Sequence, residues 1–150
     1  MSNSALVDLP AVQGGIGAMA QGAQAFPFAM SLTATTPITG AVTLTTRPTS
    51  VSSVPVPAQA QTFLAKPLTN FTGGVTLTLP VATGNYVAGD VVRVLLTVTT
   101  MNSNTCAIVD GGAGAPTLVV MPVTIANQAY VDCQLNAAGT HWTIIEAGGC

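Results

Sequence analysis

Apolar and polar residues alternate most clearly between residues 130 and 145. Before the segment 136–139 the chain is apolar at every second position, and after it Trp142 and Ile144 share one face. The segment itself consists of turn-forming residues, and Gly139 can adopt the positive φ that a tight loop requires. Alternation on both sides of a glycine-containing loop predicts a β-hairpin. Trp142, the only tryptophan, is the candidate anchor of the apolar core.

The same alternation predicts a series of strands upstream of this hairpin. The stretches that carry it are residues 31–36, 41–46, 75–79, 91–99, 105–109 and 117–125. Residues 91–99 are apolar on both faces, which predicts the most buried strand. In the last stretch, alternate positions from Val119 through Val123 to Ile125 form an apolar face. Pro122 lies on the other face and indicates a bulge or an edge strand.

No part of the chain repeats its apolar residues with the period of a helix, so the pattern predicts an all-β protein. Short strands at regular spacing are typical of an antiparallel β-sandwich or a jelly-roll-like barrel. We expect this β domain to span residues 31–150, with its best-defined part over residues 71–146. Residues 54–57, Val-Pro-Val-Pro, are expected at an edge because proline cannot donate to a β-ladder.

Residues 1–30 differ from the rest of the chain. They are rich in glycine, alanine and glutamine, and the glycines disfavour helix and strand interiors. Large apolar side chains are nevertheless spaced along the segment. We predict an extended N-terminal arm that binds a partner protein through the candidate interface residues Leu6, Leu9, Ile16, Phe26 and Phe28. The alternative is that the segment packs on its own domain or crosses to a sister subunit.

Charged residues make up only 5% of the chain, and the net charge is −2, whereas about 25% is typical. A soluble monomer normally keeps charge on its surface, so this chain must rely on Thr, Ser, Asn and Gln there or be covered by other subunits. We expect self-association, as a homotrimer. Arg47, Lys66 and Arg93 are the only cations, too few for nucleic-acid binding. No apolar stretch of about 18 residues occurs, so no transmembrane helix is expected. No cation precedes Arg47, so no secretory signal is expected either.

Residues capable of catalysis or ligand binding do not gather into a motif. His141 is the only histidine, and we expect a partly exposed side chain beside the hairpin turn rather than a metal or catalytic site. The run Gly111-Gly112-Ala113-Gly114 lacks the Lys and Ser/Thr of a phosphate-binding loop. The carboxylates are scattered singly. We therefore predict a protein that is not an enzyme, without a catalytic, cofactor-binding or metal site.

The three cysteines, Cys106, Cys133 and Cys150, are odd in number and show no CxxC spacing. This pattern predicts free thiols in a protein that folds in a reducing cytosol. A bridge between Cys106 and Cys133 on neighbouring strands is the alternative.

Four segments between residues 71 and 146 together resemble small β-rich modules of tailed-phage virions, which occur in head-decoration (cement) proteins, head fibres and tail fibres. The segments are Val75-Thr76-Leu77-Thr78-Leu79-Pro80, Gly89-Asp90-Val91-Val92-Arg93-Val94, the stretch Ile125 to Val131, and Gly139-Thr140-His141-Trp142-Thr143-Ile144-Ile145. Family members usually carry Asp-Gly before the last strand, where this chain has Ala138-Gly139. The resemblance implies a virion structural role, commonly as a homotrimer, with no catalytic residues to transfer.

Two functions compete at this point. The first is a capsid decoration protein that binds the major capsid protein, stabilises the phage head from its exterior and assembles in the host cytoplasm. The second is a fibre, spike or baseplate module that binds a glycan of the host surface. The second predicts exposed aromatic side chains, which this chain has few of, since aromatics are only 5% of it.

Overall fold

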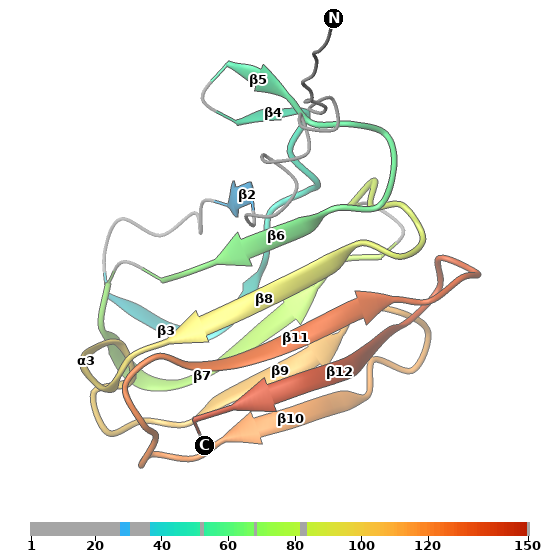
Figure 1. Cartoon of the computed structure of the whole chain (residues 1–150). Coiled ribbons are helices and arrows are strands. Elements are labelled where there is room, and N and C mark those ends of the chain that lie inside the picture. The colour runs from blue at the N-terminus through green and yellow to red at the C-terminus, as the bar shows by residue number, and fades with distance from the viewer. Residues whose placement is uncertain (1–27, 31–36, 52, 68, 82–83, 150) are drawn as a thin grey trace, which may run out of the picture.

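The computed structural model describes residues 28–30, 37–51, 53–67, 69–81 and 84–149. They contain two large β-sheets and one two-stranded sheet (Figure 1). The first sheet has the order β10-β9-β7-β3. Its strands are β3 (Ile38–Thr43), β7 (Phe71–Leu79), β9 (Cys106–Asp110) and β10 (Thr117–Met121). The second sheet has the order β12-β11-β8-β6-β2. Its strands are β2 (Phe28–Met30), β6 (Thr62–Ala65), β8 (Val91–Leu96), β11 (Ala129–Leu135) and β12 (Trp142–Gly148).

The all-β prediction is confirmed, but both sheets are mixed rather than antiparallel. The pairs β10–β9, β12–β11 and β11–β8 are antiparallel, whereas β9–β7, β7–β3, β8–β6 and β6–β2 are parallel. The cause is the route of the chain, which runs from β6 to β7 to β8 to β9 and changes sheet at each step. Alternation within a strand determines which residues face inward and carries no information about strand direction, so the sequence pattern left parallel pairing undetected.

The inward residues of both sheets form one hydrophobic cluster. Its largest fully buried side chains include Trp142, Phe63, Phe71, Leu77, Leu79 and Leu96. Burial alternates along β7 and β8, as expected for strands with one face on the core. The bulk of the stabilisation comes from this shared apolar layer, because burial of apolar surface contributes roughly 25 cal/mol per Å².

The predicted hairpin at residues 130–145 is confirmed as β11 and β12. Gly139 has a φ of 70°, and its N–H donates to the carbonyl oxygen of Asn136 at 2.9 Å. The side chain of Asn136 also accepts from the N–H of Thr140 at 2.9 Å, which closes the turn. Ile144 pairs with buried Cys133 yet is 38% exposed. It is therefore not fully in the core with Trp142, because β12 is the last strand described in its sheet.

The predicted strand 91–99 is too long and is not buried on both faces. The strand β8 ends at Leu96, and a short helix, α3 (Val98–Met101), follows. The side chain of Thr97 accepts from the N–H of Thr100 at 3.0 Å and caps this helix, which is the preferred role of threonine at such a position. The outward residues of β8 are half-buried, since the described residues place no further layer over this face.

The predicted strand 117–125 ends early, at Met121. Met121 and Ile125 are buried, but Val123 is 50% exposed, so the expected continuous apolar face is wrong at that position. Pro122 explains the difference because it lacks the N–H that would continue the ladder with β9. The expectation of an edge strand with a bulge is confirmed: β10 ends its sheet, and its register shifts between Thr117 and Val119.

The described part of the predicted N-terminal arm belongs to a sheet. Strand β2 pairs in parallel with β6, with Phe28 opposite Phe63. The boundary predicted at residue 30 stays a prediction. The predicted strand 31–36 lies outside the described residues. The first two residues of the Val-Pro-Val-Pro segment form β5 (Val54–Pro55), which pairs with β4 (Ser50–Val51) in a small separate hairpin.

Candidate interaction surface

Asp90 is the centre of a buried polar network that fixes the segment leading to β6. Its carboxylate accepts from Arg47 Nε at 2.7 Å and from the N–H of Gln61 at 2.8 Å. The Arg47 guanidinium also donates to the carbonyl oxygens of Pro57 and Gln59, at 2.9 and 2.7 Å. Both charged side chains are buried, 8% and 0% exposed. The ion pair thus has a structural role, because a buried charge is tolerated only when hydrogen-bond and ionic partners satisfy it.

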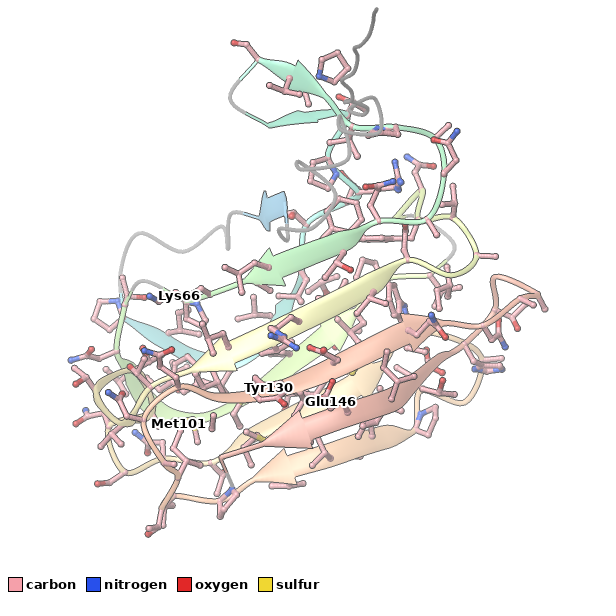
Figure 2. The ribbon with its side chains drawn as sticks, viewed as in Figure 1. Lys66, Met101, Tyr130 and Glu146 are labelled. Atoms are coloured by element: carbon pink, nitrogen blue, oxygen red, sulfur yellow. The ribbon has the colours of Figure 1, made fainter. Side chains whose placement is uncertain are left out.

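A second charged cluster lies on the outer face of β8, β11 and β12. Arg93 donates to both oxygens of Asp132, at 2.7 and 2.6 Å, and its guanidinium lies 4.3 Å from the centre of the Tyr130 ring. The Tyr130 hydroxyl hydrogen bonds to Glu146 at 2.8 Å, which raises the pKa of Tyr130 (Figure 2). Gly148 leaves the space that this ring occupies, since a Cβ there would lie 2.7 Å from it. One face of Tyr130 is therefore taken by Arg93.

His141 and Asp110 join the hairpin turn to the end of β9. His141 Nδ1 lies 2.6 Å from Asp110 Oδ2, and the two side chains are 41% and 1% exposed. Asp110 also accepts from the N–H groups of Gly112, at 2.9 Å, and Trp142, at 3.2 Å. The expectation of a partly exposed histidine beside the turn is confirmed, whereas its buried carboxylate partner was not foreseen.

His141 and Gly112 also line a pocket of about 310 Å³. Its walls are Val81, Gly111, Gly112, Ala113, Gly139, Thr140 and His141. His141 is the only titratable side chain among them. Within the described residues, no group of three or more histidines, cysteines and carboxylates could hold a metal ion. The arrangement therefore orients one imidazole, through a buried carboxylate, without a second reactive group in the pocket wall.

Four exposed aliphatic side chains lie on or shortly after β10 and on β12, each the last described strand of its sheet. We call this set the apolar edge; it consists of Val120, Val123, Ile144 and Ile145, each between 38% and 54% exposed. The N–H of Ala126 donates to the carbonyl oxygen of Gly149 at 2.7 Å and connects the segment after β10 to the end of β12. An exposed group of large apolar side chains rimmed by polar residues is typical of a protein-binding surface.

The candidate core anchor is confirmed. Trp142 is 1% exposed, and its Nε1–H donates to the carbonyl oxygen of Pro80 at 3.0 Å. Its ring meets that of Tyr86 edge to face, with 5.2 Å between centroids. Of the candidate partner-interface residues, Phe28 lies in β2. The others, Leu6, Leu9, Ile16 and Phe26, lie outside the described residues, so their predicted role stays a prediction.

Cys106 and Cys133 are free, as predicted, and the alternative of a bridge between them is wrong; both are also buried. Burial raises the pKa of the Cys106 thiol to about 12. Burial, followed by the nearby charges of Asp132 and Asp110, raises the pKa of Cys133 to about 12. Both groups therefore stay protonated and behave as small apolar core residues at neutral pH. Cys150 lies outside the described residues.

The apolar edge was not found from the sequence, because Val123 and Ile144 had been assigned to the interior. Two signals point to it in retrospect. Pro122 interrupts the alternation after β10, and Ile144 and Ile145 are adjacent, so that one of them has to face outward on any strand. A proline at the end of one edge strand and adjacent aliphatic residues in the other are the pattern that would have identified it.

No helix in the described ranges is long and apolar enough to cross a membrane. Comparisons of the chain with protein-family models, with curated proteins and with solved structures give no significant match.

Proposed function

We propose that this protein is a non-enzymatic structural component of a tailed-phage virion, a decoration or cement protein that binds the major capsid protein on the exterior of the head and stabilises it. The observation that carries the proposal is the combination of a charge-poor surface with the apolar edge. Arg47 and Arg93 each pair with a carboxylate of their own chain, and several aliphatic side chains are exposed. This arrangement is expected of a protein that functions by contact with other subunits.

The virion-like motifs support the proposal because their residues contact one another. Trp142, in the last motif, donates to the carbonyl oxygen of Pro80, in the first. Val94, in the second, lies opposite Val131, in the third, where β8 pairs with β11. Motif residues far apart in sequence thus meet in one packed unit, which gives a physical reason for the order in which the motifs occur.

The glycan-binding alternative receives less support from the aromatic side chains. Trp142, Phe63 and Phe71 are in the core, and Tyr86 packs against two of these rings. Tyr130 is the described aromatic residue on the outer face, and Arg93 covers one side of its ring. Sugar recognition by stacking needs an accessible aromatic face, and most aromatic side chains among the described residues lie in the interior.

Head binding is tested with phage heads that lack the protein. Purified protein is added to heads from a deletion phage, the heads are sedimented, and bound protein is quantified, with release of DNA on heating as the measure of stabilisation. We expect saturable binding and release at a higher temperature. Binding to host cells or their surface glycans, with none to heads, would favour the fibre or baseplate function instead.

The predicted N-terminal arm is tested in the same assay by deleting residues 2–27, which spares β2. We propose that the arm secures the protein to the head and that the homotrimer supplies three arms at high effective concentration. The truncated protein is then expected to keep its mass and fold and to lose most of its head binding. Head binding as tight as that of the full chain would assign attachment to the β domain.

A further inference from the structure

We propose that the pocket beside the hairpin turn binds a small organic carboxylate, with one carboxylate group on a short aliphatic chain, and that His141 recognises the carboxylate. The pocket has a volume of about 310 Å³, at the lower end of the range of about 300–1,000 Å³ in which proteins bind small molecules. The inference goes beyond the proposed structural role and does not depend on it, because all the wall residues belong to one chain.

The imidazole of His141 is held in one orientation by the buried carboxylate of Asp110. One oxygen, Oδ1, accepts from the N–H groups of Gly112 and Trp142, at 2.9 and 3.2 Å. The other, Oδ2, lies 2.6 Å from Nδ1 of His141. Since an ionised carboxylate only accepts hydrogen bonds, the proton of this contact is assigned to Nδ1. The ring is therefore oriented before any ligand arrives, which lowers the cost of binding.

The other ring nitrogen, Nε2, is available to a ligand. Among the described residues, none forms a hydrogen bond with Nε2. Gly112 packs against the Nδ1 and Cε1 atoms, since a Cβ on this glycine would lie 2.6 Å from Nδ1 and 3.0 Å from Cε1. The side chain of His141 is 41% exposed and forms part of the pocket wall. The pocket therefore contains an oriented polar atom without a partner in the described part of the chain.

The chemistry of the wall favours a carboxylate over other small ligands. When His141 is protonated, the imidazolium forms an ion pair with Asp110 through Nδ1, and Nε2–H becomes a donor for a charge-assisted hydrogen bond to an anionic oxygen. Val81 and Ala113 line the same pocket and offer apolar surface to a carbon chain. An inorganic anion would leave that surface unused, and a neutral ligand would gain no ionic interaction with the imidazolium.

Carboxylate binding is expected to be linked to proton uptake by His141. Histidine changes its charge between pH 5 and 8, and the anion binds the protonated form, so the ligand binds more tightly at low pH. Asp110, at the end of β9, is the charged group that faces the imidazole. Cys133, on β11, is near Asp110, but burial, followed by the charges of Asp132 and Asp110, raises its pKa to about 12. The pH dependence is therefore assigned to His141.

The presence of a single histidine makes the test direct. The full-length protein, without a histidine tag, is labelled with ¹³C in its histidine, so that the one Cε1–H signal in the NMR spectrum reports His141. Butanoate is titrated at constant ionic strength, and butanamide, which has nearly the same shape but no charge, is the control ligand. We expect a saturable shift with butanoate at pH 6, a Kd at least about tenfold higher at pH 8.5, and no saturable shift with butanamide.

A matched pair of alanine variants locates the binding site. Ala113→Leu fills the pocket and removes no hydrogen bond of the His141–Asp110 pair, whereas Ala138→Leu makes the same change in the hairpin turn, outside the pocket wall; both alanines are exposed. We expect Ala113→Leu to raise the Kd by at least about tenfold and Ala138→Leu to bind as the wild type does. His141→Gln, followed by saturation transfer from protein to butanoate, is expected to lose binding. Far-UV circular dichroism checks that each variant is folded.

Four results would overturn the inference. They are equal shifts with butanoate and butanamide, a shift that grows linearly with salt of any kind, equal affinity at the two pH values, and wild-type affinity in Ala113→Leu or His141→Gln. None of these measurements uses phage heads. Their failure therefore leaves the proposed function in place, and failure of head binding leaves this site in place.

Discussion

Replacement of Trp142 by alanine is expected to cause the largest loss of stability of any single substitution in the hairpin. The side chain is 1% exposed and lies in the shared core of the two sheets. Its removal deletes the burial of a large aromatic group and leaves a cavity, which together cost about 3–5 kcal/mol. The ring also contributes an edge-to-face contact with Tyr86, and such pairs add about 0.5–1.5 kcal/mol.

The variant Trp142→Phe separates burial from hydrogen bonding. Phenylalanine retains an aromatic ring but lacks the N–H that reaches the carbonyl oxygen of Pro80. A buried acceptor that loses its donor costs about 1–3 kcal/mol. We therefore expect the wild type to be the most stable, Trp142→Phe to be less stable and Trp142→Ala to be the least stable. The two successive losses of unfolding free energy should differ in size.

The assay is urea unfolding followed by far-UV circular dichroism, because the variants lack the tryptophan that fluorescence would use. Protein concentration is held constant, since association with other subunits contributes to apparent stability. For a chain of this length each kcal/mol shifts the melting temperature by about 2–4 °C, so Trp142→Ala should melt at least about 6 °C lower. A loss below about 1 kcal/mol would refute the assignment of Trp142 as core anchor and reopen the glycan-binding alternative.

Further predictions concern the buried ion pair, the packing at Gly112 and the two buried thiols. Asp90→Ala is expected to lower the unfolding free energy by about 3–5 kcal/mol because it leaves a buried arginine without its partner. The control Glu146→Ala, on the surface, should change the unfolding free energy by no more than about 0.5 kcal/mol. Equal effects of the two substitutions would contradict the structural role of the Asp90 network. Gly112→Ala would place a Cβ 2.3 Å from the Thr140 carbonyl oxygen. We expect it to lower the unfolding free energy by about 1–3 kcal/mol, and an unchanged melting temperature would contradict this close packing. The thiols of Cys106 and Cys133 ionise above pH 9 when unfolded but near pH 12 when folded, so stability should fall as pH rises between these values, by up to about 1.4 kcal/mol per unit for each thiol. In a variant whose third cysteine is serine, thiol reagents at pH 8 should label neither group until the protein unfolds, and rapid labelling of the folded protein would contradict their burial.

The strands that alternation predicts best are those that lie fully on the core. Residues 75–79 and the hairpin around Gly139 match the structure closely, since inward apolar residues and turn chemistry are both local properties of the sequence. The end of β8 was misplaced because Thr97 is as suitable for a strand as for a helix cap, and only the hydrogen bond to Thr100 decides between them.

The polar contacts could not be predicted from the sequence, because the residues that form each contact are distant in the chain. Arg47 and Asp90 are separated by 43 residues, and His141 and Asp110 by 31. Strand order brings them together, and strand order depends on how the chain changes sheets. The same holds for the apolar edge, because whether an aliphatic residue is inside or exposed depends on whether another strand follows in the sheet.

The central proposal, a decoration protein on the exterior of a phage head, is tested most directly by electron cryomicroscopy of virions. Particles of the phage whose genome carries this coding sequence are compared with particles of a mutant that lacks it. We predict density on the outer surface of the wild-type head, repeated over the capsid lattice and fitted by the two mixed sheets, and its loss in the mutant. Identical heads in both preparations, with the protein absent from purified wild-type particles, would contradict the account.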